Sequence, residues 1–389
     1  MTVPALVFCC LYASGLLGTV APKSWHPPEV SQAQLASHAK QAARAARAKS
    51  AKESEARQAS ELAKFRKLPG PRNFGVAIPA DELKKWYEGP PGSQKEGARV
   101  KPQMLMTFQS WGAPKKKDRM PTHELSEDKT AGIQAEMFTW EPWQAPSRGS
   151  SVAEQERVQS KYSNQKIADG KWDSYIREWA DALKSFPHIT VYIRFGHEMN
   201  GNWYPWSLDP PEYVLAWRHI WTIFHQQGVT NARFVWSADF GEGPPDADWQ
   251  NNLMAYWPGA KYVNEIGTTL INFGGTDAHA VDQFTQRIDL VHQLLKKPLM
   301  LTEVDTDKQS RSQWMLDLAK YVGQTRWIRA VVWSQQPSYG AADMKTGNMK
   351  WQVYTDKSLR ARRAFQKLAT AATKEFSSPG GSGTTDSGA

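Results

Sequence analysis

The chain has 389 residues, a formal net charge of +9 and two cysteines, Cys9 and Cys10. This length admits one large domain or two ordinary ones. Because both cysteines are adjacent in an apolar N-terminal stretch, neither a disulfide framework nor a cysteine-ligated zinc site exists in the rest of the chain.

The basic charge is concentrated in one segment. Residues 22–67 contain ten Lys or Arg and four Glu, and therefore supply +6 of the total. The 18 tryptophans, by contrast, spread from Trp25 to Trp351, which favours a protein that stacks sugar rings or bases. We expect no nucleic acid as a partner, because the basic charge does not accompany the aromatic residues.

The two ends of the chain differ in composition from the middle. Residues 3–21 are uncharged and largely apolar, which indicates a signal peptide or membrane anchor over 1–21 and hence a secreted or envelope-anchored protein. A basic, Ala/Lys-rich helical stalk is expected over 22–67 and a disordered Gly/Ser-rich tail over 375–389. We expect 68–374 to form a single catalytic domain, and the protein to be a monomer.

Within 68–374, short apolar or β-branched runs alternate with longer helical patterns. The predicted strands, in chain order, are 74–79, 103–110, 133–140, 189–196, 232–238, 266–273, 298–304 and 329–335. A helical pattern such as 210–228 begins after Asp209 and ends at Gly228. Eight such units predict an α/β fold, a (β/α)8 TIM barrel. An open doubly wound sheet is disfavoured, because no Gly-rich phosphate loop follows the first strand.

In a parallel barrel the functional residues gather where the strands end. The fourth strand ends in RFGHEMNGNWYPW, which brings to the rim Arg194, His197, Glu198, Asn200, Trp203, Tyr204 and Trp206. The seventh ends in LTEVDTD, which contributes Glu303 and Asp305. Cleavage of a glycosidic bond needs two carboxyl groups, one to protonate the leaving oxygen and one to attack or to activate water. Glu198 and Glu303 are the candidate pair.

The fourth-strand run resembles glycoside hydrolase family 26, which includes β-mannanases, mixed-linkage β-glucanases and β-1,3-xylanases. The resemblance extends through 139–143 (TWEPW), 234–239 (FVWSAD), 297–314 and 330–335 (AVVWSQ). It implies a retaining double displacement, with Glu198 as acid/base and Glu303 as nucleophile. The substrate would be a β-linked polysaccharide of the mixed-linkage β-glucan or β-mannan type.

The resemblance also implies substrate contacts. His197 would touch the sugar near the cleavage point, and Trp203 and Trp333 would floor the subsite. In TWEPW, Trp140 and Glu141 lie where an adjacent sugar could be gripped, although a structural salt bridge for Glu141 is an equal alternative. Asp239, Asp277 and His279 are weaker candidates. We expect no metal, because His and Asp lack a compact ligand spacing, and no cofactor.

Two departures from the family pattern keep an alternative open. Asp305 stands where relatives usually have Gly, and the sixth strand offers Ile271, Asn272 and Phe273 where they usually have a Tyr that orients the nucleophile. Tyr204 or Tyr339 could substitute if the loops bring them close. The alternative is a non-catalytic polysaccharide-binding protein on a degenerate barrel.

Overall fold

The computed structural model describes residues 72–89, 96–144, 158–241, 245–272, 281–306, 311–334 and 358–374. The predictions for 1–21, 22–67 and 375–389 concern residues outside these ranges. All described residues belong to the unit Lys64–Ala389. Among them, no helix has the length and apolar character needed to cross a bilayer.

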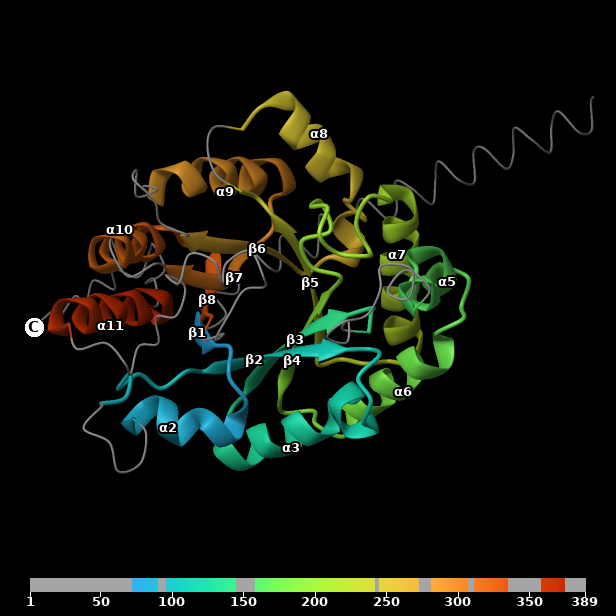
Figure 1. Ribbon diagram of the computed structural model, residues 1–389, viewed down its shortest axis with the longest axis horizontal. Helices are drawn as coiled ribbons and strands as arrows, with labels where there is room; N and C mark the ends of the chain where they lie inside the picture. The colour runs from blue at the N-terminus through green and yellow to red at the C-terminus, as the bar shows by residue number, and fades with distance from the viewer. Residues whose placement is uncertain are drawn as a thin grey trace, which may run out of the picture. The chain divides into compact units, whose positions relative to one another are not determined.

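Eight strands in the described residues pair in parallel and in chain order, and β8 closes on β1 (Figure 1). They are β1 (Asn73–Val76), β2 (Met104–Ser110), β3 (Ala135–Glu141), β4 (Thr190–Phe195), β5 (Ala232–Asp239), β6 (Glu265–Asn272), β7 (Leu299–Thr306) and β8 (Ile328–Trp333). Each overlaps one predicted strand. The prediction of a (β/α)8 barrel is therefore confirmed.

The helices surround the strands (Figure 1). They are α2 (Leu83–Glu88), α3 (Thr122–Ala131), α5 (Asn164–Ala168), α6 (Asp173–Lys184), α7 (Pro210–Gln226), α8 (Ala247–Ala255), α9 (Val281–Leu295), α10 (Arg311–Gln324) and α11 (Leu359–Thr373). Four 3-10 turns accompany them, at Ala80–Glu82, Lys116–Arg119, Ser160–Tyr162 and Ala260–Tyr262. Helix α7 begins with Pro in its first turn, and Gly228 follows it at a φ of 68°, as the sequence predicts.

Two layers of packing hold the barrel together. Alternate strand residues point inward, and the apolar ones form a small cluster of Ala77, Met104, Met106, Ala135, Met137, Val235, Met300, Ala330 and Val332. The other strand residues point outward and pack against the helices in a much larger, Trp-rich cluster. A buried Trp or Phe contributes roughly 2–3 kcal/mol on leaving water, so this outer layer dominates the hydrophobic stabilisation.

The carboxyl ends of the inward-facing rows are polar. Thr139 of β3, Arg194 of β4, Ser237 of β5 and Thr302 of β7 are all fully buried. Gly267 of β6 leaves the room they need, because a Cβ there would lie 2.8 Å from side-chain atoms of both Ser237 and Thr302. The barrel interior thus has a Met-rich apolar cluster below, together with the Arg233–Glu265 ion pair at the amino ends of β5 and β6, and a hydrogen-bonded polar layer above.

Candidate active site

Glu198 stands on a tight turn directly after β4. Gly196 and Glu198 have φ of 50° and 52°, a backbone region that is costly for a residue with a Cβ. The Glu198 amide donates to the carbonyl of Ser237 at 2.7 Å, which holds the turn against β5. A Cβ at Gly196 would meet the Tyr213 ring at 3.1 Å, so this position favours glycine twice over. Local strain at a functional carboxylate is a recurring feature of active sites.

Glu303 reaches the same space from β7 because that strand is irregular. The β6–β7 register changes between Thr268 and Thr269, so that Leu301 pairs with Thr268 but Glu303 pairs with Thr269. The register with β8 also changes between Leu301 and Val304. A bulge of this kind alters the direction in which the following side chain points. Here it leaves Glu303 on the inner face, 4% exposed.

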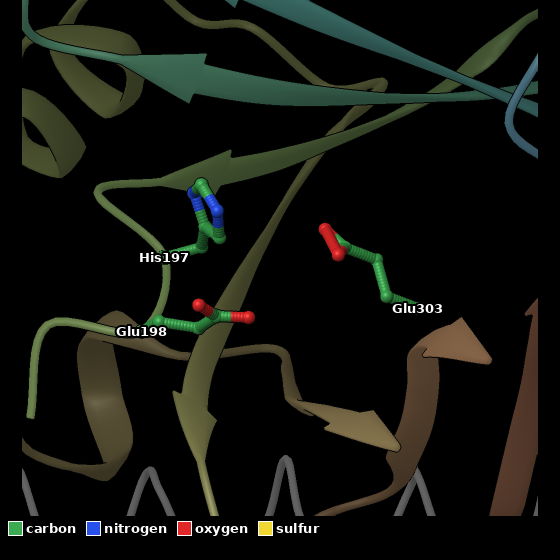
Figure 2. A group of neighbouring side chains, drawn as sticks. All are labelled: His197, Glu198 and Glu303. Atoms are coloured by element: carbon green, nitrogen blue, oxygen red, sulfur yellow. The ribbon is translucent and has the colours of Figure 1, made fainter. Parts of the chain in front are cut away.

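The two carboxyl groups face one another across the end of the barrel (Figure 2). One ring nitrogen of His197 and one oxygen each of Glu198 and Glu303 lie within 4.8 Å of one another. This spacing is close to the roughly 5 Å that separates the two carboxyl groups where one of them attacks the sugar carbon directly. It is well below the separation of roughly 6.5–9.5 Å that leaves room for a water between them.

Arg194 lies beneath this pair, fully buried, and donates to four acceptors. Its Nη1 reaches Glu303 Oε1 at 2.6 Å and Thr139 Oγ1 at 3.2 Å. Its Nε donates to Ser237 Oγ at 2.9 Å, and its Nη2 to Thr269 Oγ1 at 3.3 Å. The guanidinium therefore both neutralises Glu303 and fixes its orientation.

Glu198 accepts two hydrogen bonds of its own. The Thr269 hydroxyl donates to Oε1, and the Trp203 indole N–H donates to Oε2 at 2.9 Å. Trp203 is 52% exposed. Among the described aromatic residues at this rim, it is the one most accessible to solvent. An exposed indole beside a carboxylate is well suited to stacking on a sugar ring.

Burial governs ionisation in the pocket. It raises the pKa of Glu303 to about 7, with Arg194 opposing the change and the nearby Glu198 and Asp239 adding to it. Burial also raises the pKa of Glu141 to about 7, while a hydrogen bond from Trp143 Nε1 opposes it. The pKa of His197 falls well below its ordinary value through burial and the charge of Arg194, so the ring is neutral at neutral pH.

Aromatic residues wall the pocket behind His197. Tyr204 Oη and His197 Nε2 share a hydrogen bond of 3.0 Å, and the Tyr204 ring stacks on Trp206 with centroids 4.3 Å apart. Trp206 is buried and donates its indole N–H to the His197 carbonyl at 2.8 Å. The structure thus uses Trp206 to support the turn instead of presenting it to a ligand.

Asn200 ties the β4 loop to the end of β5. Its Nδ2 donates to the Asp239 carbonyl at 2.6 Å, and its Oδ1 accepts from the Asp239 amide at 2.9 Å. Glu141 behaves as expected for a pocket residue, because its carboxyl interacts electrostatically with both Glu303 and Glu198. Its hydrogen-bond partner among the described residues is the indole of Trp143, and Arg194 acts on it electrostatically.

Besides Trp206, two more expected sugar contacts, Trp140 and Trp333, are corrected by the structure. Trp140 is 0% exposed and points outward, where its indole N–H donates to Tyr175 Oη at 3.2 Å and its ring packs on Trp179. Trp333 is likewise 0% exposed and meets Phe365 of α11 edge-on at 5.0 Å. Both strand residues occupy outward positions, so they build the outer core.

The residues that depart from the family pattern are only partly described. Asp305 is buried, and its Oδ1 accepts the Thr306 amide at 2.8 Å. Asn272 Nδ2 donates to Thr306 Oγ1 at 3.1 Å, and Ile271 is buried. The weaker candidates Asp277 and His279, like Phe273 and Tyr339, lie outside the described residues.

Residue type alone did not single out Thr269, Ser237 or Thr139. All three hydroxyls bond the Arg194 guanidinium, and Thr269 also bonds Glu198. A usable signal exists in the sequence for Thr139 and Ser237, because each stands two residues before the carboxylate that ends its strand, Glu141 or Asp239, and so on the same face. The absence of a resident metal or cofactor stays a prediction.

A family model described as glycosyl hydrolase family 26 matches residues 139–331. Endoglucanase H of Acetivibrio thermocellus is 28% identical over 182 residues, which cover 43% of this chain and 17% of that protein. Mannan endo-1,4-beta-mannosidase A and B of Caldalkalibacillus mannanilyticus is 25% identical over 214 residues, covering 49% of this chain and 38% of that protein. The chain thus spans well under half of each of these relatives.

Solved structures share the fold. GH26C from Muricauda sp. superposes with a TM-score of 0.52 and 16% identity, covering 70% of this chain and 81% of that one. A GH26 beta-mannanase from Bacteroides ovatus gives a TM-score of 0.52 and 14% identity, covering 79% of this chain and 90% of that one. At this identity the likeness supports the fold only.

Proposed function

The chain belongs to glycoside hydrolase family 26, and on that premise we propose that it hydrolyses a β-linked polysaccharide with retention, using Glu303 as nucleophile and Glu198 as acid/base. The observation that carries the proposal is the approach of the two carboxyl groups to within 4.8 Å at the ends of β4 and β7. Two carboxyl groups at this spacing suit a double displacement.

In the first half-reaction, a Glu303 carboxylate oxygen bonds to the anomeric carbon while the glycosidic bond to the leaving oxygen breaks. Glu198 gives its proton to that oxygen, so the departing sugar leaves as a neutral alcohol. Arg194 Nη1 holds one oxygen of the attacking carboxylate, Glu303 Oε1, at 2.6 Å.

In the second half-reaction, Glu198, now ionised, takes a proton from water as the water oxygen attacks the anomeric carbon. The bond to Glu303 breaks, and Glu303 recovers its carboxylate. His197 stays neutral throughout, because its pKa lies well below the ordinary range. Its hydrogen bond to Tyr204 fixes the ring at the edge of the reacting pair.

The substrate we propose is a β-linked glucan or mannan. One relative is named as an endoglucanase and the other as a mannan endo-1,4-beta-mannosidase, which correspond to these two polysaccharides. Trp203 provides an exposed indole for stacking, and Glu141 provides a carboxyl close enough to act electrostatically on Glu198 and Glu303. We favour mixed-linkage β-glucan slightly over β-mannan, on the WYPW pattern after β4.

We further propose that the enzyme works outside the cytoplasm as a monomer. The proposal rests on the apolar run 3–21, read as a signal or an anchor. Whether that run is cleaved or tethers the protein, the barrel would meet polysaccharide in the same compartment.

The test is release of reducing ends by the full chain from a panel of β-glucans, β-mannans and β-xylans. Glu198→Ala and Glu303→Ala should each lose at least about a hundredfold of the activity, while Glu178→Ala, which removes an exposed carboxyl of α6, should retain it. Binding of a polysaccharide without cleavage across the panel would instead identify a sugar-binding protein on a degenerate barrel.

A further inference from the structure

Thr269 connects the two catalytic candidates although it belongs to neither β4 nor β7. It stands on β6, and its Oγ1 accepts from Arg194 Nη2 at 3.3 Å while its hydroxyl donates to Glu198 Oε1. Arg194 in turn donates to Glu303 Oε1 at 2.6 Å. A single chain of hydrogen bonds therefore runs from Glu303 through Arg194 and Thr269 to Glu198.

The partners of Glu198 differ in what they can do when its charge changes. An indole N–H and a guanidinium only donate, so Trp203 can hydrogen-bond to an unprotonated oxygen of Glu198 but never accept a proton from it. A hydroxyl has one donor and two acceptor positions. Thr269 can therefore donate to Glu198 Oε1 while accepting from Arg194, and it can go on donating to Oε1 as a carbonyl oxygen when the Glu198 proton is on Oε2.

The acid/base of a double displacement passes through both states in each turnover. A single carboxyl proton cannot point at Thr269 and at the leaving oxygen at once, so the acid form that donates carries its proton on Oε2, and Thr269 keeps its hydrogen bond to Oε1. Arg194 donates to Thr269 Oγ1, which directs the hydroxyl hydrogen of Thr269 toward Glu198 Oε1. The hydroxyl is thus held in place by a group that never changes charge.

From this geometry we propose that Thr269 is a positioning residue that keeps the Glu198 carboxyl aimed at the leaving oxygen in both of its protonation states. The inference rests on the proposed function and deepens it. Thr269 lies two residues before Ile271 on the same face of β6, so β6 contributes a short hydroxyl bonded to the acid/base, near the strand end where relatives usually carry a tyrosine that orients the nucleophile.

The test compares two leaving groups on one sugar. On the oligosaccharide released from the polysaccharide that the parent cleaves, Thr269→Val should lower kcat/KM by about 10–100-fold, part of the effect of a general acid. On the dinitrophenyl glycoside of the same sugar, whose leaving group departs without a proton, the loss should stay within about threefold. KM for the oligosaccharide should change little, because Thr269 acts through Glu198.

The matched variant Thr269→Ser keeps the hydroxyl and should restore most of the activity, whereas Val keeps the shape and β-branching but not the hydroxyl. Equal losses on both leaving groups, or a Ser variant as poor as the Val variant, would overturn the positioning role while leaving the parent enzyme active. A parent protein that hydrolyses neither compound would overturn the proposed function itself, and the role of Thr269 with it.

Discussion

Arg194 is the residue on which the charge of the pocket depends. It is fully buried, and the carboxyls of Glu303, Glu198, Glu141 and Asp239 act electrostatically on the same space. With one guanidinium among several acids, burial outweighs the favourable charge, and the pKa of Glu303 settles at about 7. The Glu303 carboxyl, which must attack as an anion, is therefore mostly ionised only above that pH.

This gives a pH prediction for the reaction. Because protonated Glu303 cannot attack, kcat/KM should decline as pH falls through about 7, and not near the ordinary carboxyl value of 4.5. Asp239→Asn removes a negative charge that raises the pKa of Glu303, and the amide keeps the acceptor for the Gly241 N–H. The acidic limb of the profile should then shift to lower pH.

The measurement is kcat/KM against pH for the parent and for Asp239→Asn. An acidic limb near 4.5 in the parent, or an unmoved limb in the variant, would contradict the view that burial and neighbouring carboxylates set the ionisation of Glu303. Asp181→Asn, which alters an exposed carboxyl of α6, serves as a control and should leave the profile unchanged.

Single residue types were the least predictable feature from sequence. Glu198, Glu303, His197, Arg194, Glu141 and Trp203 all reach the pocket as expected, but Trp140 and Trp333 do not. Trp140 precedes Glu141 by one residue, and successive side chains of a strand point to opposite faces. If Glu141 points inward, Trp140 must point outward. The TWEPW motif suggested that both residues bind the sugar. Strand alternation instead places Glu141 in the pocket and Trp140 in the outer core.

Among the structural elements, the bulge in β7 is the feature that could not be predicted from the sequence. A regular β7 would change which residue between Leu301 and Val304 points inward, and the register shifts against β6 and β8 show that the strand is not regular there. Strand existence and order follow from apolar runs and helix signals. The position of a bulge depends on side-chain packing between neighbouring strands.

Helix α3 and strand β3 carry a second pair of buried carboxyls, away from the active site. Asp128 and Glu136 are 2% and 1% exposed, with Glu124 as a further acid beside them. Burial raises the pKa of Asp128 to about 7 and that of Glu136 well above its ordinary value. The folded protein therefore holds a proton here that the unfolded chain releases near pH 4–5.

The raised pKa values of Asp128 and Glu136 make the free energy of unfolding depend on pH. Since the folded state binds more protons than the unfolded state between about pH 4 and 7, the free energy of unfolding should fall as pH rises through that window. Glu136→Gln replaces one acid with an amide that can donate to Asp128. It should raise the free energy of unfolding at pH 8 by about 2 kcal/mol and flatten its pH dependence.

Urea unfolding at pH 5 and pH 8 measures both quantities. Glu178→Gln, on the exposed surface of α6, is the matched control and should change the free energy of unfolding by no more than about 0.5 kcal/mol at either pH. A Glu136→Gln variant that loses stability at pH 8 would mean that the pair is satisfied as charged groups.

At the scale of the whole molecule, the barrel separates stability from chemistry. Its interior has a Met-rich apolar cluster and the Arg233–Glu265 ion pair toward the amino ends of the strands, and the polar layer around Arg194 at the carboxyl ends. Eight alternating units were enough to predict this architecture from the sequence. The distance between Glu198 and Glu303 was not, because it depends on the turn after β4 and the bulge in β7 together.

That distance predicts the stereochemistry of the first product. With one oxygen of each carboxyl within 4.8 Å, there is no space for a water between Glu303 and the anomeric carbon. Proton NMR of the first minutes of hydrolysis should therefore show the new reducing end appearing as the β-anomer, and only later mutarotating to the equilibrium mixture. First appearance of the α-anomer would mean inversion, and would contradict the assignment of Glu303 as nucleophile.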